Sequence, residues 1–366
     1  MRTTIRKLMS TMFHTLQVKD IHRETEDSVV LSFNVPSELQ EDFSFVPGQY
    51  LTLETAIQGE DVRRSYSLCS APFENEWKVA VKRVENGKFS TYANQQMNSG
   101  DEIKVMAPTG NFKLETRADN KNHYVAFAAG SGITPILSMI KTVLKEEPNS
   151  TFTLFYGNRN LDTIIFREEL EALKNRYVKR LSVHHILSKE KLGSPLFFGR
   201  IDAEKCKKFG SVFFNPSEVH SFYLCGPSQM IFAVKDQLAD LGVDASKIHF
   251  ELFTTSDIKV EKKKVEASFN PETESKVTII LDQESFDMPL AYGGTSILDA
   301  ALAAGADLPY ACKGGVCSTC KAKITEGEVI MDINYALEPD EVEQGFVLTC
   351  QSHPRTSTVT VDFDEA

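Results

Sequence analysis

Short alternating segments dominate the first third of the chain. They are rich in β-branched and aromatic residues, and Gly, Pro and Asn separate them at intervals typical of antiparallel strands. The runs cover residues 14–22, 29–33, 50–53, 65–69 and 78–84. A short helix is expected over 90–97. The pattern predicts an antiparallel β-barrel over residues 12–116.

Strands alternate with helices in the middle of the chain. An apolar run at 124–129 precedes a helix that is expected to start at Pro135, because proline fits the first helical turn. Further strands are expected at 152–156, 181–186 and 221–224, and further helices at 166–175 and 228–241. This alternation predicts an α/β domain over 117–256, with an open, doubly wound parallel sheet.

The last third begins with a polar stretch and then changes pattern again. Residues 257–274 lack an apolar period, and we interpret them as an interdomain linker. A hairpin is expected over 276–288, followed by a helix over 297–305 that Ser296 caps and Gly305 ends. With a final strand at 359–363, the pattern predicts an α+β domain over 275–366.

Four cysteines in this last domain have a specific spacing. Cys312, Cys317 and Cys320 form C-x4-C-x2-C, and Cys350 follows after 29 intervening residues. This is the plant-type ferredoxin spacing for a [2Fe–2S] cluster. Gly314 and Gly315 suit a loop that curls and points backbone N–H groups at sulfur. The four cysteines are therefore the expected metal ligands.

Two other interpretations of these cysteines remain. A zinc site is possible in principle, but such sites usually pair two short C-x2-C knuckles and this segment holds one. Structural disulfides would fit a secreted chain, and the N-terminus has basic residues without the apolar core of a signal peptide. Cys69, Cys206 and Cys225 are left over, which fits a reducing cytoplasm.

Composition and charge exclude some classes of protein. The chain is 42% hydrophobic and 25% charged, and no apolar run approaches the length of a membrane span. The net charge is −11; residues 275–366 carry 15 acids and 5 bases, a balance of −10. An acidic domain argues against a nucleic-acid partner. It is either an ordinary solvated surface or a docking face for a basic partner, and we favour docking.

The first segment contains Arg63-Arg64-Ser65-Tyr66-Ser67, which resembles the R-x-Y-S motif of the ferredoxin–NADP reductase superfamily. A guanidinium can fork onto a flavin phosphate, a tyrosine ring gives the isoalloxazine a flat face, and a serine hydroxyl can hydrogen-bond flavin N5. The resemblance gives these roles to Arg64, Tyr66 and Ser67. Taken alone, the motif is also compatible with an ordinary edge strand.

Three further matches follow in the same order as in that superfamily. Pro47-Gly48-Gln49-Tyr50 lies upstream, residues 87–90 match a G-x-x-S phosphate loop at a helix N-terminus, and residues 108–112 match the segment that closes the barrel. The resemblance implies FAD rather than FMN, which binds relatives with a shorter phosphate loop. The expected flavin-binding residues are Gln49, Tyr50, Arg64, Ser65, Tyr66, Ser67, Gly87, Lys88, Ser90 and Thr91.

The second segment carries matches for a nicotinamide dinucleotide. Gly130-Ser-Gly132-Ile-Thr134-Pro135 follows a strand, although G-x-G-x-x-P is weaker than the full dinucleotide fingerprint. Cys225-Gly226-Pro227 resembles the motif that places a cysteine beside the nicotinamide; a buried Cys225 acting as a small hydrophobe is the alternative. By resemblance, Glu251 lies near the hydride path and Phe253 near the flavin. Ser67, Cys225 and Glu251 are the expected catalytic residues.

Tyr156-Gly157-Asn158-Arg159 bears on the choice of nicotinamide cofactor. Enzymes that select NAD place an acidic residue after the second strand to bind the ribose 2′-hydroxyl. None follows here, and Arg159 could pair with a 2′-phosphate, so we favour NADPH while NADH remains possible. Alternatively, Arg159 is only a solvated loop residue. Asn158 and Arg159 complete the expected nucleotide-binding residues.

Apart from its first dozen residues, the chain resembles the flavin–nicotinamide–ferredoxin reductases of multicomponent oxygenases, and within them the branch that serves phenylacetyl-CoA ring epoxidation. The likeness rests on module order and on R-S-Y-S-L-C-S, Y-G-N-R and C-K-G-G-V-C-S-T-C. It implies a β-grasp ferredoxin fold for 275–366, and electron flow from NADPH through FAD and the cluster to an oxygenase docked near the acidic domain. Three functions stay open: this one or the reductase of another oxygenase, an electron-shuttle module with scaffolding domains, and a zinc-bearing interaction protein.

Overall fold

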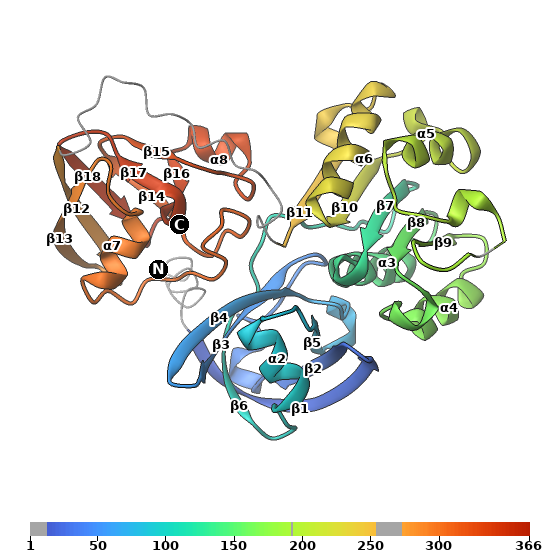
Figure 1. Ribbon diagram of the computed structural model, residues 1–366, viewed down its shortest axis with the longest axis horizontal. Helices are drawn as coiled ribbons and strands as arrows, with labels where there is room; N and C mark the ends of the chain where they lie inside the picture. The colour runs from blue at the N-terminus through green and yellow to red at the C-terminus, as the bar shows by residue number, and fades with distance from the viewer. Residues whose placement is uncertain (1–12, 192, 254–272) are drawn as a thin grey trace.

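The computed structural model describes residues 13–191, 193–253 and 273–366. Figure 1 shows three bodies, which follow one another along the chain from blue through green and yellow to red. The predicted linker, 257–274, lies outside the described residues except at its end, where Glu274 begins a strand. None of the helices in the described ranges has the length and apolar character needed to cross a bilayer.

The first body is an antiparallel sheet closed into a barrel. Its described strands have the order β4-β3-β6-β1-β2-β5. An isolated bridge between Leu68 and Val79 connects the two ends of this order. Alternate residues such as Leu51 and Leu53 fill the interior, as the period of two requires. The elements are β1 (Phe13–Thr25), β2 (Ser28–Asn34), β3 (Tyr50–Ile57), β4 (Glu60–Ser67), β5 (Trp77–Lys82), α2 (Lys88–Gln95) and β6 (Glu102–Met106).

The second body is a parallel sheet with the described strand order β11-β10-β7-β8-β9. The order reverses between β7 and β10, which creates a topological switch point at the carboxyl ends of these strands. The strands are β7 (His123–Ala129), β8 (Thr151–Asn158), β9 (Leu181–Leu187), β10 (Ser221–Gly226) and β11 (Ile248–Leu252). The helices are α3 (Ile133–Glu146), α4 (Arg167–Arg176), α5 (Ala203–Val212) and α6 (Ser228–Asp240).

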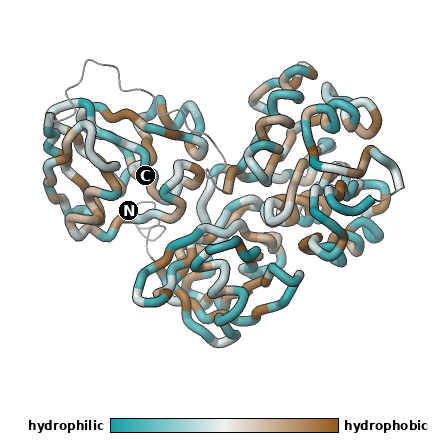
Figure 2. Tube along the Cα trace, viewed as in Figure 1, coloured by the Kyte–Doolittle hydropathy of each residue, from teal (hydrophilic) through white to brown (hydrophobic). Residues whose placement is uncertain are grey.

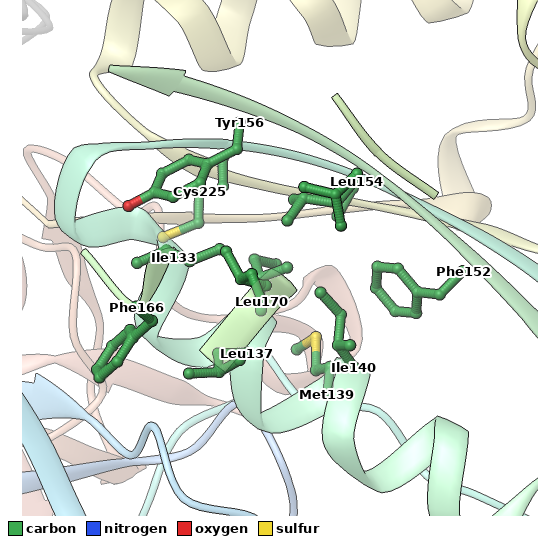
Figure 3. Packing of buried hydrophobic residues seen from close by; sticks show 14 of the residues in the cluster. Ile133, Leu137, Met139, Ile140, Phe152, Leu154, Tyr156, Phe166, Leu170 and Cys225 are labelled. Carbon is green, nitrogen blue, oxygen red and sulfur yellow. The ribbon is translucent and has the colours of Figure 1, made fainter. Parts of the chain in front are cut away.

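Helices cover both faces of this sheet, as a doubly wound fold requires. Tyr124 and Ala126 of β7 pack with α3, whereas Val125 and Phe127 face the cluster formed with α5 and α6. Figure 3 shows side chains of α3, among them Ile133 and Ile140, against side chains of β8. Figure 2 shows hydrophobic and hydrophilic positions interspersed along all three bodies. The buried cluster around α3 also includes barrel residues such as Phe112 and Leu114, so the first two bodies share a packed boundary.

The third body is a five-stranded sheet, with the described order β13-β12-β18-β14-β16, and one packed helix. Ser296 caps that helix as predicted, because its hydroxyl accepts from the Asp299 N–H at 3.2 Å. The elements are β12 (Glu274–Leu281), β13 (Glu284–Ala291), α7 (Ile297–Ala303), β14 (Lys321–Glu326), β15 (Val329–Met331), α8 (Pro339–Glu343), β16 (Phe346–Leu348), β17 (Ser352–Pro354) and β18 (Thr358–Asp362). β15 and β17 form a separate pair.

The three bodies meet around the loop that carries Cys312, Cys317 and Cys320. Cys317 packs against Tyr50 of the barrel, and Val316 joins the core cluster of the parallel-sheet domain. Phe232 of α6 also lies 6.0 Å, between ring centroids, from Tyr335. The cysteine loop is therefore enclosed by both of the domains that precede it in the chain.

Candidate functional site

The R-x-Y-S segment lies at the carboxyl end of β4. Ser67 is buried, Ser65 and Tyr66 are half-buried, and Arg64 is exposed. The Tyr66 ring packs on Phe89 of α2 at a centroid distance of 5.4 Å, and burial raises the pKa of its hydroxyl. The Arg64 guanidinium hydrogen-bonds only the carbonyl of Arg63 among the described residues. An exposed guanidinium can donate hydrogen bonds to a phosphate, and the fixed tyrosine ring beside it can stack on a flat ring system.

The predicted phosphate loop is a tight turn into α2. Gly87 is the N-cap, and a Cβ there would lie 2.4 Å from Ser90 Oγ and 3.1 Å from the Val84 carbonyl. Ser90 Oγ accepts from the Val84 N–H at 3.1 Å and so fixes the loop. Lys88 forms an exposed ion pair with Glu60, and Thr91 is half-buried. A Cβ at position 87 would crowd these two atoms, and the N-cap makes no side-chain hydrogen bond to the first N–H groups of α2, which leaves them for an anion.

Two other matched segments pair with each other. Tyr50 and Thr109 exchange backbone hydrogen bonds of 2.9 and 3.1 Å, which joins the start of β3 to residues 108–112. Gln49 accepts the Val46 N–H at 2.9 Å through its side chain and closes the preceding turn. The Tyr50 hydroxyl faces the cysteine loop, 3.3 Å from Ser318 Oγ and 3.1 Å from Thr319 Oγ1. Tyr50 is therefore shared between the predicted flavin site and the cluster loop, which sequence reasoning missed.

The glycine-rich turn after β7 lies directly against the end of β10. A Cβ on Gly132 would be 2.1 Å from the Cys225 carbonyl oxygen, so the turn requires glycine there. Gly130 adopts a φ of +55°. The helix begins at Ile133, two residues before the predicted start, and Pro135 still lies in its first turn. Thr134 donates to the Ser131 carbonyl at 3.0 Å and holds the turn.

The structure brings the three expected catalytic residues together. Cys225 of β10 and Glu251 of β11 are register partners, and Ser67 Oγ of the barrel donates to Glu251 Oε2 at 3.2 Å. Burial raises the pKa of Glu251 to about 8, against which the Ser67 hydrogen bond acts, although part of the residue still reaches solvent. At neutral pH its carboxyl is therefore mainly protonated. Gly226 and Pro227 follow as the turn into α6.

Cys225 lies beside Glu251 and is also part of a hydrophobic core. Burial, and secondarily the nearby Glu251, raise the pKa of its thiol well above the usual value. In Figure 3 its sulfur lies beside Ile133, and Cys225 belongs to the core cluster around α3. The side chain thus also packs as the small hydrophobe of the alternative interpretation. Phe253, just after β11, is 40% exposed and can cover a ring bound at the junction.

Arg159 and Asn158 lie at the carboxyl end of β8, as predicted. Arg159 Nη2 is 3.1 Å from Asp27 Oδ2 in the β1–β2 turn, so Arg159 is not simply a solvated loop residue. Asn158 Nδ2 is buried without a hydrogen bond of ordinary geometry within the described ranges, and the Asn158 side chain lies close enough to the Tyr156 hydroxyl to lower its pKa against the larger effect of burial. Burial alone would raise the pKa of Asp27, but Lys82, Thr25, Ser28 and Arg159 together lower it.

The four predicted ligand cysteines converge as two pairs. Cys312 and Cys317 have their sulfurs 3.0 Å apart, and Cys320 neighbours Cys350; none is in a disulfide. Two pairs match a [2Fe–2S] cluster, in which each iron takes two cysteine sulfurs. The thiol of Cys317 and the backbone N–H of Gly314, at 3.3 Å, are directed at the Cys312 sulfur and lower its pKa. The loop curls through positive φ at Lys313 (+50°) and Gly315 (+71°).

Thr349 positions the fourth predicted ligand, Cys350, which lies beyond the end of β16. β16 ends at Leu348, and Cys350 lies in the following turn of 3₁₀ helix. Thr349 donates to the Cys320 carbonyl from its backbone N–H at 3.1 Å and from its hydroxyl at 2.9 Å. These bonds hold Cys350 beside Cys320. The residues present therefore fit a [2Fe–2S] cluster in their donor type, pairing and backbone support.

The comparisons with known proteins agree with this geometry. Residues 15–114 match the oxidoreductase FAD-binding domain, 127–236 the oxidoreductase NAD-binding domain, and 279–355 the 2Fe-2S iron-sulfur cluster binding domain. The fold class and the three cofactor types predicted from the sequence are confirmed. The individual site residues and the domain boundaries stay predictions.

Relatives match over nearly the whole chain. A component of the 1,2-phenylacetyl-CoA epoxidase of Escherichia coli (strain K12) is 45% identical over 97% of this chain and 98% of its own. The ferredoxin reductase component of 3-ketosteroid-9-alpha-monooxygenase from Rhodococcus rhodochrous is 32% identical over 95% and 96%.

A solved structure is also similar over nearly the whole chain. Phthalate dioxygenase reductase, a modular structure for electron transfer from pyridine nucleotides to [2Fe–2S], has a TM-score of 0.56 and 25% identity, covering 96% of this chain and 98% of its own. The chain belongs to the three-module oxidoreductases, the reductase components of oxygenases, in which an FAD domain, an NAD domain and a plant-type ferredoxin domain follow one another on one polypeptide.

Proposed function

We propose that this chain takes hydride from NADPH and passes electrons singly to the oxygenase component of a phenylacetyl-CoA epoxidase. The observation that carries the proposed electron route is a pair of register partners in the barrel, Tyr50 of β3 and Ser67 of β4. Ser67 contacts Glu251 of the nicotinamide domain, and Tyr50 contacts Ser318 and Thr319 of the cluster loop. Two adjacent residues thus link the hydride site to the one-electron carrier.

The bound FAD would supply the ability to receive a pair of electrons and release them one at a time. Arg64 would hold its phosphate, Tyr66 would support its ring, and Ser67 would hydrogen-bond the edge of that ring. The N-terminus of α2, approached closely at Gly87, would bind the pyrophosphate. Gln49, Ser65, Lys88, Ser90 and Thr91 would complete the cradle. Phe253 and the enclosing domains would exclude water.

The proposed binding site for the nicotinamide dinucleotide is formed by the turns after β7 and β10. Gly130, Gly132, Thr134 and Pro135 would receive the dinucleotide phosphates, and Cys225, Gly226 and Pro227 would line the nicotinamide. The Glu251 carboxyl is mainly protonated at neutral pH and would therefore hold a proton next to the Ser67 hydroxyl, at the edge of the proposed hydride site. NADPH is favoured over NADH because Arg159 lies where the adenine ribose is expected and no acidic residue follows β8 directly.

The partner assignment rests on the 45% identity to an epoxidase component along the whole chain. We place partner docking at the acidic ferredoxin domain, where Glu338, Asp340 and Glu343 are exposed around Val342. A reducing cytoplasm is the proposed location, since Cys69, Cys206 and Cys225 are buried thiols without disulfides.

The test uses the purified full-length chain carrying both prosthetic groups. With NADPH it should reduce ferricyanide and cytochrome c, and kcat/KM for NADPH should exceed that for NADH. Added to the purified oxygenase component, it should support NADPH-dependent epoxidation of phenylacetyl-CoA. Failure of the loaded protein to oxidise either nicotinamide would refute the reductase function. Turnover only with a different oxygenase would refute the assigned partner.

A further inference from the structure

Arg63 connects the flavin barrel to the ferredoxin domain. It lies on β4, and its side chain is buried, with 9% exposed. Its Nη1 donates to the Leu308 carbonyl at 2.9 Å, and its Nη2 donates to Asp307 Oδ1 at 2.8 Å. Both acceptors lie shortly before the first cluster ligand, Cys312. A residue 244 positions away in sequence from Asp307 therefore contacts the entry to the cluster loop.

The rest of the guanidinium is held from the barrel side. Its Nε donates to Glu54 of the neighbouring strand β3, which is 3% exposed and also pairs with Lys104 at 2.7 Å. Glu54 thereby orients the fork of Arg63 and leaves its two outer nitrogens for the ferredoxin domain. A planar guanidinium with several fixed donors can make such a set of contacts, whereas an ammonium group cannot.

Aromatic rings complete the surroundings of this side chain. The Arg63 guanidinium carbon lies 4.6 Å from the ring centroid of Tyr310 and 4.8 Å from that of Phe13. Tyr310 is only two residues from Cys312. Each nitrogen of the Arg63 guanidinium is thus hydrogen-bonded, and two aromatic rings lie against it, which compensates for the burial of the charge.

A second set of contacts holds the other end of the same loop. The Ser318 N–H donates to the Tyr50 hydroxyl at 3.2 Å, and Thr52 Oγ1 lies 3.4 Å from Thr319 Oγ1. These contacts involve neutral groups, whereas those of Arg63 are charge-assisted and stronger. Among these contacts of the cluster loop with β3 and β4, those of Arg63 are the charge-assisted ones.

We propose that Arg63 is a positioning residue that fixes the cluster loop against the flavin barrel and so sets the rate of the internal one-electron step. This inference rests on the proposed function, because it concerns the transfer between the two prosthetic groups. The Arg63 guanidinium contacts neither the predicted flavin-binding side chains nor the cluster cysteines, and only the backbone carbonyl of Arg63 accepts a hydrogen bond from Arg64. The guanidinium acts through Leu308, Asp307 and Tyr310.

The experiment compares two electron acceptors in the full-length loaded protein. Ferricyanide can take electrons before the cluster, whereas cytochrome c reduction reports transfer through it. In Arg63→Met, cytochrome c reduction should fall roughly tenfold, the ratio expected for losing one or two charge-assisted hydrogen bonds, while ferricyanide reduction and FAD content stay unchanged. Arg63→Lys should recover only part of the rate. Asp307→Asn should reduce the rate of cytochrome c reduction by a smaller factor. The Asp307 side chain is 87% exposed, so this substitution should leave folding unaffected.

A structural readout is independent of turnover. Hydrogen–deuterium exchange at the Ser318 amide, which donates to Tyr50, should accelerate in Arg63→Met and Asp307→Asn but not in the control Lys104→Gln. Lys104 binds the same Glu54 and makes no contact with the ferredoxin domain among the described interactions. Unchanged Ser318 exchange together with unchanged cytochrome c reduction in both variants would overturn the inference. If the wild-type protein fails to reduce ferricyanide, the proposed function fails, and the exchange comparison alone decides the role of Arg63.

Discussion

Glu251 should make the stability of the folded protein depend on pH, and one substitution should remove this dependence. Its pKa is about 8 in the folded chain, against 4.5 as the ordinary value. Between these values the folded protein holds a proton that the unfolded chain has released, so stability falls as pH rises through this window. Each pH unit crossed costs up to about 1.4 kcal/mol. Glu251→Gln should therefore gain thermal stability over wild type as pH is raised from about 5 to about 8.

The measurement is the midpoint of thermal unfolding as a function of pH, with Glu85→Gln on an exposed loop as the control. The NADPH–ferricyanide rate should also lose an inflection near pH 8 in Glu251→Gln. A constant difference in midpoint between wild type and Glu251→Gln across this range would show that the carboxyl is ionised throughout.

The sequence was informative about which residues matter and less so about what they touch. Ser67, Cys225 and Glu251 were singled out from three separate motifs, and the structure brings them together at one junction. Tyr50 was expected to serve the flavin alone, yet its hydroxyl lies on the cluster loop. Its partner is 269 residues away, and no local pattern encodes a contact between the surfaces of two separate domains.

At the level of elements, Lys141 of α3 forms ion pairs with both the barrel and helix α4. It is 8% exposed and lies 2.9 Å from both Glu74 of the barrel and Glu169 of α4. Lys141→Met would leave two carboxylates facing each other without their shared cation. Because both acids are partly exposed, solvent screens part of this cost, and we expect a loss of about 2 kcal/mol in stability. Denaturant unfolding followed by flavin fluorescence measures it.

Lys145→Met is the matched control, since Lys145 lies one turn further along α3 and is exposed. It should change the free energy of unfolding by less than about 0.5 kcal/mol. Equal effects of the two substitutions would mean that Lys141 contributes through its aliphatic stem and not through its charge.

Arg159 tests the cofactor preference at the end of β8. If it receives a 2′-phosphate, Arg159→Ala should raise KM for NADPH roughly tenfold, because a charge-assisted contact is lost, while KM for NADH changes little. Asp27→Asn frees Arg159 from its partner across the domain boundary and should lower KM for NADPH. Steady-state kinetics with both nicotinamides decide the matter. An equal effect of Arg159→Ala on both cofactors would exclude recognition of the phosphate.

Elements with strong apolar patterns were predicted well, and weakly amphipathic ones were missed. The buried strands β7 and β8 and the apolar helix α3 lie within two residues of expectation. α5 was not expected, because it buries only Cys206 and Phe209 and contains Gly210. Its one local signal was the cap at Asp202, which accepts from the Lys205 N–H at 2.8 Å. Its two buried residues pack in the same cluster as those of α6, a contact that the local sequence pattern does not encode.

For the molecule as a whole, the uneven charge predicts how a partner is recognised. Nearly all of the net charge of −11 belongs to residues 275–366. Opposite charges steer association at low ionic strength, and about 0.1 M salt screens them beyond roughly 10 Å. Reduction of the basic protein cytochrome c should therefore slow as salt is raised, whereas reduction of anionic ferricyanide should not. The double substitution Asp340→Asn with Glu343→Gln should slow cytochrome c reduction roughly threefold at low salt and flatten its salt dependence.

The comparison must separate local docking from total charge. Asp119→Asn with Asp240→Asn removes the same two negative charges from exposed positions outside the ferredoxin domain. If α8 is part of the docking face, the control pair should keep the wild-type rate and salt slope, because its charges lie outside the ferredoxin domain. Equal effects of both pairs would show that only net charge steers the partner, and would move the docking face away from Asp340 and Glu343.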